Sequence, residues 1–199
     1  MSRLLFCLFL LLPPLVTSAH AVEVHVTAPA LQRTLEQQLF NQAGPNGTLV
    51  RHYLRGDATT ACSVYADDPH VAFREDRVVV TLNTHAKLGF GKACFGISLS
   101  TESRVSFIPE AEGESVGFRD ARIEHLSNNR ELDMLMEPFL SKKLPQEMKV
   151  NAAEMLRNLL VKAPDSTGYK LILSKLKLHS MLVDGQELVV DLDANVRVD

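Results

Sequence analysis

Histidine, aspartate and cysteine are the residue types in this 199-residue sequence that could catalyse a reaction or bind a metal. After residue 21 the histidines occur singly, and none stands two or four positions from another. A spacing of two residues in a strand, or of four in a helix, would place two metal ligands on one face. We therefore expect surface or structural histidines and no metal site. These residues are His25, His52, His70, His85, His125 and His179.

The motifs of the common enzyme classes are missing from the sequence. It contains no G-x-S-x-G, no H-E-x-x-H, no phosphate-binding loop and no G-x-G-x-x-G after a predicted strand. Asp191 and Asp193 share one strand face, as carboxylates on an ordinary solvated strand also do. The sequence thus predicts no catalytic residue and no cofactor. A hydrolase whose site is assembled from distant residues stays open as a minor alternative.

An export signal is indicated at the N-terminus. Arg3 is the single charged residue before the apolar run Leu4–Leu12, and Ala19-His20-Ala21 is a small-x-small cleavage site. The prediction is a signal peptide over residues 1–21, then one domain over residues 22–199 in the periplasm or secreted. No later apolar stretch approaches 20 residues, so we expect no transmembrane segment.

Two cysteines, Cys62 and Cys94, follow the predicted cleavage site, whereas Cys7 lies inside the signal. In an oxidising compartment two cysteines are typical of a disulfide bond. Two separate buried thiols are the alternative.

The charge balance argues against nucleic acid as a partner. Loss of Arg3 with the signal changes the formal net charge from −3 to −4. Phosphate binding depends on clustered lysine and arginine, and the sequence has no such cluster.

Hydropathy patterns place the elements around these residues. Val22, Val24 and Val26 alternate with polar residues as in a half-buried strand, and Pro29 opens a short amphipathic helix. Alternation from about residue 48 to 126 predicts a strand meander, with turns at Ser100–Ser103 and Glu110–Ser115. A second alternating region surrounds the turn dipeptide Asp184-Gly185. Strands in series, with helices before and after them, predict an α+β fold with an antiparallel sheet.

A long amphipathic helical segment is predicted between these strand regions. Its apolar residues recur at helical spacing, and Pro138 should kink or restart it. Residues 131–163 hold five acids and five bases, without the cationic excess that favours adsorption to anionic membranes. The apolar stripe must therefore pack against protein or line a cavity. We predict a groove for a lipid-like chain, with plain core packing as the alternative. The candidate lining residues are Leu132, Leu135, Met136, Phe139, Met148, Met155, Leu156 and Leu159.

The order of elements resembles the small bacterial periplasmic proteins of the tubular lipid-binding superfamily, which share the fold of bactericidal/permeability-increasing protein. The resemblance rests on that order and on the closing segment V-D-G-Q-E-L-V-V-D-L, residues 183–192. It implies a curved antiparallel sheet wrapped around a long helix, binding apolar molecules and carrying no shared catalytic residues. Many such small proteins are lipoproteins with a cysteine at the cleavage site. Ala21-Val22 at that position favours a freely diffusing form.

Two main functional hypotheses follow. The first is a non-catalytic protein that binds a lipid or another long apolar molecule. The second is a periplasmic scaffold or accessory protein with a fully packed core that holds a protein partner.

The disulfide prediction can be tested by thiol titration. A bridge between Cys62 and Cys94 closes a loop of about 33 residues, worth roughly 3 to 4 kcal/mol in the chain-entropy model. The unfolded, unreduced protein should therefore show almost no reactive thiol. Two titratable thiols per chain would refute the bridge.

Overall fold

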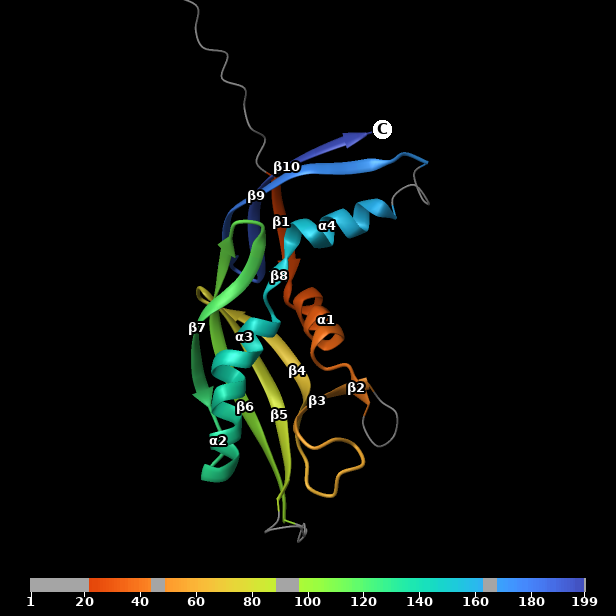
Figure 1. The fold of residues 1–199 in the computed structure, drawn as a ribbon. Helices are drawn as coiled ribbons and strands as arrows, with labels where there is room; N and C mark the ends of the chain where they lie inside the picture. Colours follow the sequence, from red (N-terminus) through yellow and green to blue (C-terminus); the bar gives the residue numbers. More distant parts are fainter. Residues whose placement is uncertain (1–21, 44–48, 89–96, 163–167, 199) are drawn as a thin grey trace, which may run out of the picture.

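The computed structural model describes residues 22–43, 49–88, 97–162 and 168–198, which form two antiparallel sheets and several helical pieces (Figure 1). The elements in chain order are β1 (Val22–Thr27), α1 (Ala28–Gln38), β2 (Gln42–Ala43), β3 (Leu49–Arg55), β4 (Val64–Arg74), β5 (Arg77–Leu88), β6 (Ile97–Glu112), β7 (Ser115–His125), α2 (Arg130–Pro138), the π-helix η1 (Phe139–Lys143), α3 (Leu144–Glu147), β8 (Val150–Asn151), α4 (Ala152–Val161), β9 (Leu171–Asp184) and β10 (Glu187–Val198).

Sheet topology joins the two ends of the domain. The first strand, β1, pairs with β10 in a three-stranded sheet of order β1-β10-β9, with Val24 opposite Val190. The meander β2 to β8 forms a strongly curled seven-stranded sheet in sequence order. All pairings are antiparallel, so the protein is an α+β protein with a curved antiparallel sheet. The predicted turn at Asp184-Gly185 joins β9 to β10, with Gly185 at a φ of 60°.

One predicted turn is wrong. Ser100–Ser103 lies within β6 and pairs residue by residue with β5, Ser100 opposite His85 and Ser103 opposite Leu82. Serine and threonine suit a strand when their hydroxyls find partners, and Ser103 Oγ is 3.1 Å from Thr84 Oγ1 in the core. The composition of this segment resembled a turn because the polar side chains face both sides of the strand.

The long helical segment is not one helix. Pro138 ends α2 because proline has no N–H for the ladder, and the chain continues as the π-helix η1 and the short α3. The chain then extends at β8, where Val150 pairs with Val116. Asn151 restarts the helix by accepting a hydrogen bond from the N–H of Glu154 at 2.8 Å. The apolar stripe is therefore split between α2–α3 and α4, which cover different parts of the sheets (Figure 1).

A single hydrophobic cluster joins both sheets and the helices. It includes Leu35 and Leu39 of α1, Val80 of β5, Phe107 of β6 and Leu188 of β10. Alternation in β5 sends Val78, Val80, Leu82 and Ala86 to this core, as their pattern predicts.

Bulges bend the long β6–β7 hairpin, and Arg77 stabilises the bend. The register shifts between Ser106 and Ile108, which removes backbone groups from the ladder. Arg77 donates from Nε to Ser106 Oγ at 2.9 Å and from Nη2 to the Ser106 carbonyl at 3.0 Å. It also donates to the Asp120 carbonyl and, at 3.0 Å, to the Asp120 carboxylate. The hydrogen bond from Arg77 to the Asp120 carboxylate is the largest cause that lowers the pKa of Asp120.

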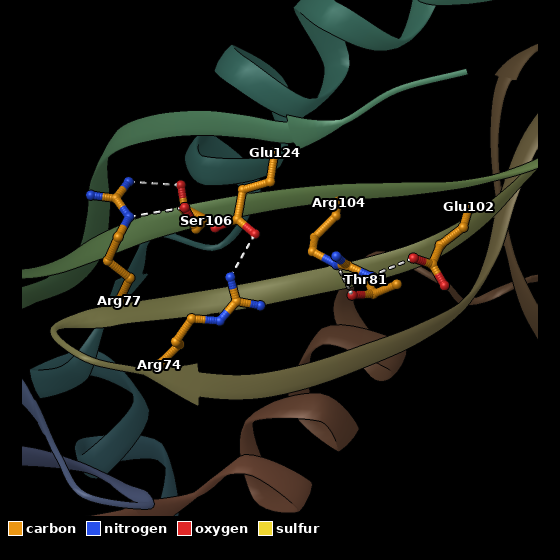
Figure 2. Close-up of polar contacts among 7 residues, drawn as sticks. All are labelled: Arg74, Arg77, Thr81, Glu102, Arg104, Ser106 and Glu124. Carbon is orange, nitrogen blue, oxygen red and sulfur yellow. Dashed lines mark hydrogen bonds and ion pairs between the residues drawn. The ribbon is translucent and has the colours of Figure 1, made fainter. Parts of the chain in front are cut away.

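Exposure distinguishes Arg77 from Arg74, which lies opposite it at the turn of the β4–β5 hairpin. The Arg77 side chain is 10% exposed, whereas Arg74, paired with Glu124 at 3.0 Å, is 57% exposed. Figure 2 shows Arg77 with Ser106 and Arg74 with Glu124. It also shows Arg104, which donates hydrogen bonds to Thr81 and Glu102.

This contrast gives a matched pair of substitutions. Arg77→Gln should lower the free energy of unfolding by about 2 to 4 kcal/mol, because it leaves the carbonyl of the buried Ser106 and the carbonyl of Asp120 without their Arg77 donors. Arg74→Gln should cost at most about 1 kcal/mol, since it removes an exposed ion pair. Urea unfolding of both variants measures the difference. Equal costs would show that the bulge does not depend on Arg77.

Candidate functional site

The three-stranded sheet presents one apolar face to the interior. Cross-strand pairing puts Val26 beside Leu188, Val190 beside Met181 and Leu192 beside Leu178. We call this side the inner face. From β9 to β1 its residues are Leu171, Leu173, Leu176, Leu178, Met181, Val183, Leu188, Val190, Leu192, Ala194, Val196, Val198, Val22, Val24 and Val26.

Two bulges in β9 keep this face apolar. The register skips one residue of β9 between Asp191 and Leu192 and another between Asn195 and Val196. The extra residues are His179 and Ser174. Leu173 and Leu176 are three residues apart, as are Leu178 and Met181. In a regular strand the two members of each pair would face opposite sides of the sheet, and the bulges place them on the same side.

The tip of the β6–β7 hairpin holds the inner face against the rest of the molecule. The Gly113 carbonyl accepts a hydrogen bond from the N–H of Leu178 at 3.4 Å. The Glu114 carbonyl accepts from the N–H of Ala152 at 2.9 Å, at the start of α4. The tip thus binds both β9 and α4, which brings α4 across the inner face.

An apolar cavity lies where the two sheets meet, and we call it the seam cavity. Its volume is about 150 Å³. Among its described lining residues, the polar ones are Thr34 and Gln38, both on α1. The apolar lining residues come from both sheets and from three helical or linking segments: Val26, Leu31, Leu35, Val116, Phe118, Met148, Val150, Met155, Met181, Leu188 and Val190.

The structure divides the eight predicted lining residues. Met148 and Met155 line the seam cavity. The remaining six lie elsewhere: Leu132, Met136 and Phe139 are buried in the core over the seven-stranded sheet, Leu135 and Leu156 are half-buried, and Leu159 is 59% exposed. The exposed position of Leu159 follows from the partial cover of α4, in which only Ala153 is buried.

Sequence reasoning missed most of the cavity lining. Val26, Leu188 and Val190 belong to alternating runs that were recognised, but the pairing of β1 with β10 is a contact between the ends of the chain and leaves no local signal. Met181 lies beyond the bulge at His179, so it breaks the period-2 pattern. A search for three-residue steps inside alternating runs would have found both bulges.

The histidines hold structural positions. His25, His85 and His179 lie within 3.0 Å of the carboxylates of Glu187, Asp67 and Asp193, respectively. In the described ranges no three histidine, cysteine or acidic side chains are grouped so that they could hold a metal ion.

Of the two carboxylates singled out in β10, Asp193 binds His179 on the outer side of the sheet. Asp191 Oδ1 is buried and has no hydrogen-bond partner among the described residues. The two carboxylates therefore have different surroundings.

Among the histidines that the structure describes, His52 alone is buried in the core. Its ring stacks on Phe139 at 5.1 Å, and its Nδ1 lies 3.1 Å from the Leu39 carbonyl at the end of α1. Nε2 lies 3.3 Å from Lys143 Nζ. A carbonyl accepts and an ammonium donates, so these partners select the neutral tautomer with hydrogen on Nδ1. Burial lowers the pKa of His52, and the charge of Lys143 lowers it further, while the Leu39 hydrogen bond and Glu147 act in the opposite direction.

Cys62 lies just before β4, and Cys94 lies outside the described residues. The neighbouring Ser63 carbonyl accepts a hydrogen bond from the N–H of Lys87 at 2.8 Å, close to the end of β5. The described end of β5 therefore lies beside Cys62. The disulfide itself stays a prediction, as does the signal peptide over residues 1–21.

Comparisons with known proteins give one distant likeness. No family model matches the sequence, and no curated protein matches it. Among solved structures, the chain is similar to a crystal structure of lipopolysaccharide binding protein, with 12% sequence identity and a TM-score of 0.36. The match covers 89% of this chain and 50% of that one, so the chain spans about half the length of that protein. A likeness of this size does not show a shared family, and membership in the tubular lipid-binding superfamily stays a prediction.

None of the helices in the described ranges is both long enough and apolar enough to cross a membrane.

The environment of His52 predicts a pH dependence of stability. Because its folded pKa lies below the unfolded value of about 6.5, the unfolded chain binds more protons as the pH falls through this window. The free energy of unfolding should be fully retained above about pH 6.5 and decrease below it, by at most about 1.4 kcal/mol per pH unit. Urea unfolding between about pH 7.5 and 5.5 measures the slope.

His52→Gln should remove this slope, whereas His70→Gln, on the exposed side of β4, should keep it. An unchanged slope in His52→Gln would assign the pH dependence to other groups.

Proposed function

We propose that this protein binds a lipid or another long apolar molecule in the seam cavity and does not transform it. One observation supports the proposal above the others: side chains from both sheets and from α1 and α4 leave an apolar space at their junction instead of closing it. Protein interiors are normally packed without such voids. Three of the lining residues are methionines, Met148, Met155 and Met181, whose unbranched side chains adapt to irregular ligands.

The size of the cavity limits what it encloses. Cavities of about 150 Å³ with aliphatic linings stay dry and accept small apolar groups. Sites that enclose a whole drug-sized molecule are larger, about 300 to 1,000 Å³. The seam cavity therefore suits the end of an apolar chain, and a longer molecule must continue outside it.

The inner face provides that continuation. Val24, which pairs with Val190 of the cavity wall, is 42% exposed, and Val22 beyond it is 46% exposed. Met155, on the α4 side of the cavity, is 50% exposed. An apolar strip thus leads from the cavity to the surface along β1. A ligand that covers this strip would remove apolar area from water, and this burial is favourable by roughly 25 cal/mol of free energy per Å².

The absence of a catalytic role is part of the same proposal. Thr34 and Gln38 supply the polar groups of the cavity, and neither has an acidic or histidine partner there. Export to the periplasm or secretion, with a Cys62–Cys94 disulfide, completes the proposal on the sequence evidence.

A block at the mouth of the cavity tests the function. Thr34 is an exposed residue of α1 that also lines the cavity, so Thr34→Phe should fill its opening. We expect delipidated parent protein to bind the neutral methyl ester of a fluorescent fatty acid saturably, and Thr34→Phe to bind it about tenfold more weakly or worse, a loss of about 1.4 kcal/mol.

Two controls accompany the block. Thr34→Ala keeps the mouth open, and Gln37→Phe adds the same ring to α1 at an exposed position away from the cavity. Both should bind like the parent. Unchanged binding in Thr34→Phe would remove the seam cavity from the account, and no saturable binding by the parent would favour the scaffold hypothesis.

A further inference from the structure

We propose a second binding site, in the groove between α4 and the start of β9, for a single-chain amphiphile with an anionic head. The groove has a volume of about 330 Å³ and is mostly apolar. Its apolar part includes Leu160 and Val161 of α4 and Leu171 and Leu173 of β9. This volume falls in the range of sites that enclose a small molecule.

An apolar strip also extends this groove. In the register of the three-stranded sheet, Leu173 lies opposite Val196 and Leu171 opposite Val198. Val196 is 45% exposed and Val198 is 60% exposed. An acyl chain seated on β9 can therefore continue across β10 and cover side chains that would otherwise face water.

Two cations mark the polar end of the groove. Arg157 and Lys170 line it, and none of its lining residues in the described ranges is a carboxylate. Arg157 contacts Glu114 Oε1 through Nη2 at 3.3 Å, which leaves most of its five N–H donors for another acceptor. Lys170 makes no ion pair or hydrogen bond in the described ranges. A carboxylate or phosphate head placed between the two would receive charge-assisted hydrogen bonds.

This preference for anions is local. The protein as a whole carries a formal net charge of −3, so its general field does not attract anionic ligands. Selection for an anionic head must come from Arg157 and Lys170 themselves.

The groove is distinct from the seam cavity and goes beyond the proposed function. The two spaces have no lining residue in common within the part of the chain that the structure describes. Thr34→Phe, which blocks the seam cavity, leaves the groove intact and supplies the background in which the groove is tested alone.

The test compares ligands that differ in the head group. On the Thr34→Phe background we expect saturable binding of dodecanoate and of dodecyl phosphate, measured by calorimetry, and clearly weaker binding of the neutral methyl dodecanoate. Arg157→Gln with Lys170→Gln should weaken both anions about tenfold or more and leave the methyl ester unchanged. Inorganic phosphate alone should not compete, because it lacks the chain.

A matched control removes the same charge elsewhere. Lys162→Gln with Lys175→Gln changes one exposed cation next to α4 and one on the outer side of β9, neither lining the groove. This variant should bind all ligands like its background. Glu114→Gln, which frees Arg157 from its ion pair, should bind the anions at least as tightly.

The contradicting outcomes are separable. Equal binding of methyl dodecanoate and dodecanoate, or competition by inorganic phosphate, would overturn the anionic amphiphile. Binding in the parent that disappears in Thr34→Phe would overturn the second site and leave the proposed function standing. No binding in the parent would overturn both.

Discussion

The two sheets are held together by the tip of the β6–β7 hairpin. Through their carbonyls, Gly113 and Glu114 accept hydrogen bonds from β9 and from the first turn of α4. To reach that point the hairpin must be long and bent, and Arg77 satisfies the backbone carbonyls at its bend. Because the tip docks between α4 and β9, the inner face of the three-stranded sheet is covered in part and left open in part. The seam cavity and the α4–β9 groove are consequences of this incomplete cover.

Local signals predicted much of the secondary structure. The turn at Asp184-Gly185, the strand over Val22–Val26 and the helix after Pro29 each depend on residues close in sequence, and the structure contains all three. The predicted restart near Pro138 also occurs, since the missing N–H is a property of that residue. The turn at Ser100–Ser103 was wrong, because its polar side chains are satisfied across a strand by partners such as Thr84, and no local pattern shows such a partner.

The candidate site depends on contacts that no local pattern contains. Whether Leu132 or Met148 borders a cavity is decided by where each helical piece docks, and the break at β8 sends the two pieces of the stripe to different places. In β9 the bulges at Ser174 and His179 each shift the alternation of side chains between the two faces of the sheet. The face that carries Met181 therefore cannot be assigned from a strict two-residue period. The pairing of β1 with β10 closes the cavity with residues more than 160 positions apart. The apolar character of the site could therefore be predicted from the sequence, whereas the residues that line it depend on the tertiary structure.

The central claim is that the seam cavity holds an apolar molecule. Its most direct test is the native mass spectrum of protein purified from its own cells without detergent, before and after extraction with organic solvent. The account predicts a native mass above that of the chain, returning to the chain mass on extraction, with an apolar compound recovered in the solvent in about equal molar amount. A native mass equal to that of the chain, with no apolar compound extracted, would contradict it.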